Sequence, residues 1–209
     1  MNHTLDLLRD MVKRYHPFSP QEERDKENIL FYLERFPDLL ERTNPLVHGV
    51  SSAVVLNQER THVLMVHHNI YKEWSLPGGH ADGEENLLLT ARREAEEETG
   101  LPPSPLGSGI FSLDLLPVIG HYKNGAYLSP HIHIAPSFLF SGGSSCPLRK
   151  REEENSAVGW IPLEDFPTIT SESHMRPVYR KIAEKIKAYK ESSEKPFNTE
   201  RSDCSDFIG

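Results

Sequence analysis

Cysteines, long apolar runs and net positive charge are all scarce in this chain of 209 residues. Its two cysteines, Cys146 and Cys204, lie far apart in polar surroundings, so we expect neither a disulfide framework nor a cysteine-based zinc site. No apolar run approaches the ~20 residues that a membrane helix needs, and the N-terminal residues lack the continuous apolar stretch of a secretory signal. We therefore expect a cytoplasmic protein that does not enter a membrane.

The net charge of −8 disfavours a nucleic-acid polymer as a partner, because such binding relies on basic patches that displace counterions from phosphates. A small phosphorylated ligand remains compatible with an acidic protein, since bound metal ions can supply the missing positive charge. The length suits one domain with attachments, and the hydrophobic share of 37% is enough for one buried core.

Residues 1–45 are predicted to form an N-terminal helical extension. Apolar residues recur at helical spacing over 4–16, and a second helix is expected to begin at Ser19. Ser19, Pro20 and Glu22 form a capping-box pattern at its start. Two such helices bury little surface alone, so their apolar faces need a partner, either the following domain or a second subunit of a homodimer.

Residues 46–190 show short strands flanked by helices, which predicts an α/β sandwich with a mixed β-sheet. Strands are expected at 50–56, 62–66, 110–116, 131–140 and 157–161, and helices at 84–99 and 176–189. A turn is expected at 77–79 and a loop around Asn124 and Gly125. The polar, unpatterned residues 191–209 are predicted to form a disordered tail.

The segment that carries chemical information runs from residue 79 to 101 and is rich in carboxylates. On an α-helix, Glu94, Glu97 and Glu98 fall within about 100° of arc, where like charges repel one another. A divalent cation removes this repulsion, and hard ions such as Mg²⁺ prefer oxygen ligands. A solvated acidic helix is the ordinary alternative, but it does not explain the spacing of the whole segment.

This segment resembles the Nudix box, G-x5-E-x7-R-E-U-x-E-E-x-G-U with U an aliphatic residue, and it matches every fixed position. The order of elements over residues 46–190 is also similar to the Nudix fold, an α/β/α sandwich. The resemblance implies a pyrophosphohydrolase that uses Mg²⁺, or Mn²⁺ as a substitute, to cleave a diphosphate bond by attack of water on phosphorus. The alternative is a Nudix-fold module that binds a nucleotide without cutting it, but such modules usually lose box carboxylates.

The resemblance also implies residue roles. It assigns metal binding to Glu94, Glu97 and Glu98, catalysis to Glu97, Glu98 and Arg93, and support of the box to Glu85. Arg93 lies four residues before Glu97 on the helix and is expected to orient that carboxylate. At Gly79 a side chain would obstruct the approach of backbone and substrate.

Five further residues are candidates outside the carboxylate set. Glu154, just before the last strand, is expected to act as an auxiliary ligand or general base, with a charged loop as the alternative. His80, His131 and His133 could contact a substrate phosphate or join a zinc site, although ordinary surface or core histidines are more common. Trp74 could stack on a substrate ring or serve as a core aromatic. Nudix substrates range from nucleoside triphosphates to nucleotide sugars and ADP-ribose, and the box does not choose among them.

Overall fold

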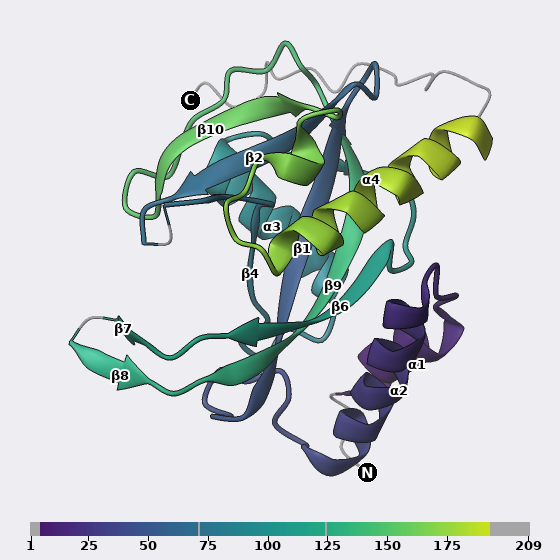
Figure 1. Ribbon diagram of the computed structural model, residues 1–209, viewed down its shortest axis with the longest axis vertical. Coiled ribbons are helices and arrows are strands. Elements are labelled where there is room, and N and C mark those ends of the chain that lie inside the picture. The colour runs from purple at the N-terminus through teal and green to yellow at the C-terminus, as the bar shows by residue number, and fades with distance from the viewer. Residues whose placement is uncertain (1–4, 71, 124, 193–209) are drawn as a thin grey trace. The chain divides into compact units, whose positions relative to one another are not determined.

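Short strands alternate with helices in this protein, whose computed structural model describes residues 5–70, 72–123 and 125–192 (Figure 1). In chain order the elements are α1 (Asp6–Arg14), α2 (Pro20–Arg35), β1 (Val47–Asn57), β2 (His62–His68), β3 (Trp74–Ser75), β4 (Gly78–His80), α3 (Leu87–Thr99), β5 (Ser104–Pro105), β6 (Ser112–Val118), β7 (His121–Lys123), β8 (Ala126–Leu128), β9 (His131–Gly142), β10 (Asn155–Pro162) and α4 (Met175–Ser192), with a short 3-10 helix at Phe166–Thr168. The tail predicted for 191–209 lies outside the described residues, apart from its first two, which end α4.

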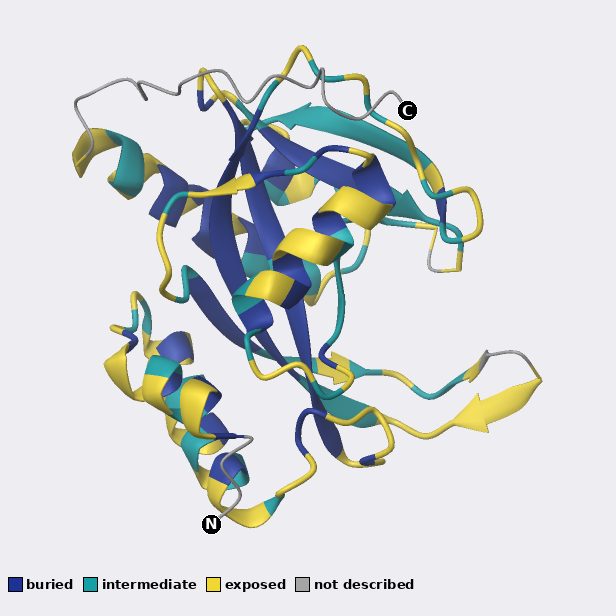
Figure 2. Cartoon of the chain, turned by 180° about the vertical axis from the view of Figure 1, so that it is seen from behind, coloured by how far each residue is buried: buried dark blue, intermediate teal, exposed yellow. Residues whose placement is uncertain are grey.

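Hydrogen bonds join the main strands in the order β10-β2-β1-β9-β5, and β3, β4 and β6 pair with β2, β1 and β9 respectively. This mixed sheet with flanking helices confirms the predicted α/β class. β1 is buried along almost its whole length (Figure 2), so it forms the centre of the core that its apolar sequence predicts. The division of the chain at residues 45 and 190 stays a prediction.

The chain divides into two units. Unit 1 comprises Met1–Ala53, Gly78–Glu94 and Pro105–Leu139, and unit 2 comprises Val54–Pro77, Ala95–Ser104 and Phe140–Gly209. β1, α3 and β9 therefore each contain a boundary between the two units. Each unit is best understood from its own contacts.

In unit 1 the N-terminal helices are fastened to β6 through Glu22. Ser19 caps α2 as predicted, with its hydroxyl accepting a hydrogen bond from the Glu22 amide at 3.3 Å. The buried Glu22 carboxylate, however, accepts hydrogen bonds from the amide of Phe18 (2.7 Å), the hydroxyl of Ser112 (3.2 Å) and the amide of Leu113 (3.3 Å). The Glu22 carboxylate thus binds the amide of Phe18, one residue before the cap, and also reaches β6, a partner distant in sequence.

In unit 1, short strands form where the sequence predicted a turn and a loop. β4 pairs with β1, with Ser51 opposite Gly79, where we expected only a turn. At Gly78 a Cβ atom would lie 2.4 Å from the carbonyl oxygen of Ser51, so only glycine permits this close approach. The hairpin of β7 and β8 lies where a loop was expected, and the residues of β8 are exposed (Figure 2).

In unit 2 the predicted hairpin between β1 and β2 is confirmed, with Leu56 opposite Val63. The side-chain oxygen of Asn57 accepts hydrogen bonds from the amides of Thr61 (2.8 Å) and His62 (2.9 Å), which closes the turn. β10 pairs with β2 along its length, and α4 buries a stripe of side chains: Tyr179, Ile182, Ala183 and Ile186. These contacts give unit 2 an apolar interior of its own.

Two expectations drawn from composition concern membrane helices and cysteines. No helix among the described residues is both long enough and apolar enough to cross a membrane. The expectation that Cys146 and Cys204 form no disulfide framework stays a prediction, because Cys204 lies outside the described residues.

Candidate functional site

The carboxylates of the predicted metal site are carried by α3, whose sequence explains its position. Leu87, Ala91 and Ala95 are fully buried, so the helix offers one apolar face to the interior. The helix begins three residues later than predicted and ends before Gly100, whose positive φ of 71° fits the predicted glycine stop. Glu85 is exposed and lies just before the first turn.

In unit 1, Glu94 lies where the chain has made room for a carboxylate. A Cβ atom at Gly79 would come within 2.4 Å of the Glu94 carboxyl carbon, so the glycine leaves that space to Glu94. Arg93 forms an ion pair with Glu94, with 2.9 Å between Nη1 and Oε1, and the side chain of Glu94 is only 13% exposed. The box glycine and the box arginine therefore both act on this one carboxylate.

In unit 2, one guanidinium joins two of the predicted site residues. Nη1 of Arg151 lies 3.2 Å from Oε2 of Glu97 and 3.6 Å from Oε2 of Glu154. The structure thus brings Glu154 close to Glu97, although 57 residues separate them in the sequence. Arg151 was not singled out from the sequence, where we expected Arg93 to orient Glu97.

Glu98 is the buried member of the set, with 4% of its surface exposed. Nδ2 of Asn155 donates a hydrogen bond of 3.1 Å to Oε1 of Glu98 and fixes its orientation. Oδ1 of Asn155 is also buried and has no hydrogen-bond partner within the described parts of the chain. Carboxylate oxygens with an unsatisfied amide oxygen beside them form a donor set that suits a hard cation such as Mg²⁺ or Mn²⁺.

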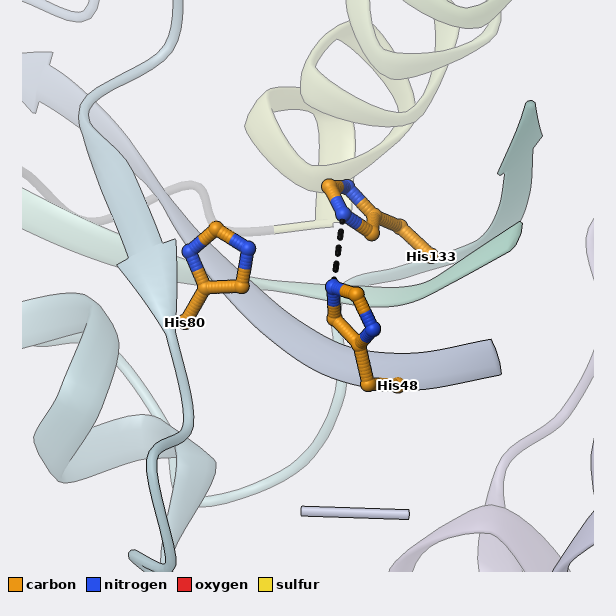
Figure 3. A group of neighbouring side chains, drawn as sticks. All are labelled: His48, His80 and His133. Carbon is orange, nitrogen blue, oxygen red and sulfur yellow. Dashed lines mark hydrogen bonds between the residues drawn. The ribbon is translucent and has the colours of Figure 1, made fainter. Parts of the chain in front are cut away.

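The predicted histidines come together in unit 1 and are joined by His48, which the sequence did not single out (Figure 3). His48 stands on β1, His80 on β4, and His131 and His133 share one face of β9 as expected. The ring centroid of His48 lies 5.2 Å from that of His80, 4.7 Å from that of His131 and 4.8 Å from that of His133. Burial, and after it the charges of His80, His48 and His131, lower the pKa of His133 to about 2. Burial likewise lowers the pKa of His48.

Trp74 lies on β3 in unit 2 and is half-buried. Its ring meets the edge of His67 at a centroid distance of 5.4 Å, and its carbonyl accepts a hydrogen bond of 3.3 Å from the hydroxyl of Tyr179. The residue is therefore held in place and still partly accessible, which leaves both sequence-based interpretations open.

Comparison with known proteins gives this geometry a context. The family model for the NUDIX domain matches residues 47–182, which is more than half of the chain. A CMP-5'-(N-acetyl-N-hydroxy-3-aminopropyl)phosphonate hydrolase of Streptomyces rubellomurinus is 32% identical over 121 residues, covering 55% of this chain and 52% of the relative. The chain therefore spans about half the length of that relative. An RNA pyrophosphohydrolase of Pelagibacter ubique is 26% identical over 147 residues, covering 68% of this chain and 92% of the relative.

Among solved structures, a NUDIX hydrolase from Nitrosomonas europaea aligns with a TM-score of 0.51 at 19% identity, covering 68% of this chain and 89% of that one. At this identity the similarity shows a shared fold. It agrees with the order of strands and helices described above.

Proposed function

Because the chain belongs to the Nudix family, we propose that it is a Mg²⁺-dependent hydrolase that cleaves a diphosphate bond in a nucleoside diphosphate-linked or related small molecule. The observation that carries this proposal is the complete carboxylate set on α3, Glu94, Glu97 and Glu98, together with the space that Gly79 leaves for Glu94. A fold that only binds nucleotides has no need to keep all three.

Glu94, Glu97 and Glu98 would hold the metal ion, for which Mn²⁺ is a substitute. When bound, the ion supplies positive charge that neutralises the diphosphate and lowers the pKa of a coordinated water. Asn155 holds Glu98, and Arg93 holds Glu94, so two of the carboxylates keep a fixed orientation before any ion arrives. Such preorganisation is the main source of rate enhancement when little covalent chemistry is required.

We assign Glu154 the role of auxiliary ligand or general base. The shared contact with Arg151 supports this role, since it keeps the Glu154 carboxylate near Glu97. A general base must lie within hydrogen-bond reach of the attacking water, directly or through one further water. Arg151 also contacts Glu153, but through Nε at 3.9 Å, whereas Glu154 lies 3.6 Å from Nη1, the same atom that contacts Glu97.

The substrate is proposed to be a small nucleotide derivative. The names of two relatives point to different substrates, a CMP-linked phosphonate in one case and RNA in the other. The net charge of −8 favours the small molecule, because a polymer would bring many phosphates to a surface that repels them. Trp74, half-buried on β3, is the proposed stacking contact for a ring of the substrate.

A substrate panel with Mg²⁺ tests the proposal. The full chain should be incubated with nucleoside triphosphates, dinucleoside polyphosphates, nucleotide sugars, ADP-ribose, CMP-phosphonates and an RNA carrying a 5′-triphosphate, with products identified by mass spectrometry. We expect turnover of a small nucleotide that excess chelator abolishes and added Mg²⁺ restores. Turnover in excess chelator would contradict the metal assignment, and tight binding of a nucleotide without turnover would identify a binding module instead.

A further inference from the structure

Three histidines from three different strands of unit 1 converge on one point (Figure 3). His48 comes from β1, His80 from β4 and His133 from β9, and one ring nitrogen of each lies within 4.8 Å of the other two. The pairing of β1 with β4, with Val50 opposite His80, brings the first two together. Nothing in the proposed hydrolysis uses this cluster, so its chemistry needs a separate explanation.

The hydrogen bonds around the cluster determine where the protons and lone pairs lie. Nδ1 of His48 lies 3.0 Å from the carbonyl oxygen of Asn44, which can only accept, so this nitrogen carries the proton. Nδ1 of His131 lies 2.8 Å from the carbonyl oxygen of Ser129, with the same consequence. In their neutral forms, both rings then direct the lone pair of Nε2 away from these carbonyls.

Those two lone pairs meet a single third nitrogen. Nε2 of His133 lies 3.1 Å from Nε2 of His48 and 3.2 Å from Nε2 of His131. A neutral His133 can donate one proton from Nε2, so it can satisfy one of its two neighbours but not both. A cation bound by Nε2 of His48 and Nε2 of His133 would accept both of these lone pairs.

The separation of His48 and His133 agrees with a particular class of cation. Zn²⁺ bonds to imidazole nitrogen at about 2.0–2.1 Å, and tetrahedral angles then separate two ligand nitrogens by about 3.3 Å. The separation of 3.1 Å between His48 and His133 is close to this value. Imidazole nitrogen suits Zn²⁺ and similar transition-metal ions, whereas Mg²⁺ prefers oxygen.

We propose that His48, His80 and His133 form a binding site for a divalent transition-metal ion, with Zn²⁺ as the best match, separate from the carboxylate set of α3. Three protein ligands leave one tetrahedral position for a water, and His131 stands beside it. The carbonyl of Asn44 plays the part of the outer-shell acceptor that orients a metal-binding histidine. For His80 and His133 this proposal takes up the zinc-site alternative left open by the sequence, in place of substrate contact.

The alternation of side chains along β4 separates this site from the box. Successive residues of a strand point to opposite faces, and position 79 points to the Glu94 carboxylate. His80 therefore points to the other face of β4. The ion would join β1, β4 and β9 within unit 1 and stabilise the folded chain by mass action.

Direct titration of the full chain with ZnCl₂ tests the proposal. Metal should first be removed with a chelator, and calorimetry should then be run in excess Mg²⁺, which keeps the carboxylates of α3 occupied by an oxygen-preferring ion. We expect the wild type to bind one Zn²⁺. His80→Asn and His133→Asn should each weaken this affinity by at least about 100-fold, beyond the 10–100-fold typical of outer-shell changes. The exposed His174 provides the matched control, and His174→Asn should bind as the wild type does.

Two further measurements distinguish this site from the box and from a loss of folding. Glu97→Gln should retain this ion within a few-fold, whereas its loss would assign the ion to the box and overturn the proposal. Circular dichroism in chelator shows whether each variant folds, and the half-buried His80 carries the test if His133→Asn does not. Absence of Zn²⁺ binding by the wild type, or unchanged binding by the folded His80 variant, would also overturn it.

Discussion

Glu22 on α2 and Glu97 on α3 both lie on helices among other acidic side chains, but their surroundings differ. Glu22 is fully buried, and both of its oxygens accept hydrogen bonds from neutral groups with fixed positions, the amides of Phe18 and Leu113 and the hydroxyl of Ser112. The side chain of Glu97 is 41% exposed and is paired with the guanidinium of Arg151. A carboxylate held by backbone amides stabilises the fold, whereas one held by an exchangeable charge can accept a metal ion.

The residues around Glu22 are also held by contacts within the protein. Burial, followed by the hydrogen bond and charge of Glu22, raises the pKa of Tyr15 well above its ordinary value. Tyr15 ends α1, and the ammonium group of Lys26 on α2 donates a hydrogen bond of 2.7 Å to its carbonyl. The N-terminal helices are therefore held by a polar network that is complete without any ion.

The largest effect is expected for Glu97→Gln. The amide keeps the shape of the side chain but removes a charge that would hold the metal, so kcat should fall by about 100-fold or more while folding is barely affected. Glu96→Gln is the matched control, because Glu96 is exposed and lies about 100° round the helix from Glu97. Steady-state kinetics at saturating Mg²⁺ should show the control within a few-fold of wild type. Equal losses in both variants would contradict the helical-face argument.

Glu22→Ala, unlike Glu97→Gln, should cause a large loss of stability. Removing the carboxylate leaves its buried donors without an acceptor, so the free energy of unfolding should fall by roughly 2–3 kcal/mol. Chemical denaturation monitored by circular dichroism measures this, with Glu23→Ala, an exposed neighbour on α2, as the control. A stability equal to that of wild type would show that the network does not fasten α2 to β6.

Gly79→Ala should reduce activity by about 10-fold with little change in stability. The added methyl group would collide with the carboxylate of Glu94, the end of a side chain that can move aside, so the fold should survive while a proposed metal ligand is displaced. Gly107→Ala is the control, because a Cβ atom there meets nothing within 4 Å. Unchanged kcat in the Gly79 variant, measured across a Mg²⁺ titration, would mean that the position of Glu94 is not critical.

The smallest effect concerns Glu73 in unit 2 and depends on pH. Hydrogen bonds from the hydroxyl and amide of Ser171, and from Thr170, favour the ionised carboxylate and lower its pKa below the ordinary 4.5. This stabilisation is present above the unfolded-state pKa and is lost as the pH falls through the folded-state pKa. Glu73→Gln should therefore lower the melting temperature by roughly 1–2 °C at pH 7 and by less below pH 4.5. Glu164→Gln is an exposed control, and a difference independent of pH would contradict the assignment.

The sequence predicted the local features of the molecule well. The helix predicted at 84–99 corresponds to α3, which carries the glutamates of the box. The hairpin after Asn57 and the cap at Ser19 were also predicted, because each depends on residues within one turn of each other. In every case the determining interactions are short in sequence separation.

The features that were missed depend on distant partners. Arg151 and Asn155 meet α3 across more than 50 residues, and no local pattern distinguishes them from other polar residues in a loop or at the start of a strand. His48 has no motif of its own and acquires meaning only when β4 and β9 bring two further imidazoles beside it. The short strands β3 and β4 likewise exist because a neighbouring strand supplies their hydrogen bonds, not because of local propensity.

Arg151 affects the charge balance of α3 when the proposed metal ion is not bound. Three acidic side chains on one helical face would otherwise repel one another, and the guanidinium compensates part of that charge through Glu97 and Glu154. Partly exposed ion pairs of this kind contribute only about 0–1 kcal/mol, so they are easily exchanged for a stronger partner. In the proposed enzyme, Arg151 would therefore hold the place of the metal ion, so that folding would not depend on Mg²⁺ and binding of the ion would be a separate, reversible step.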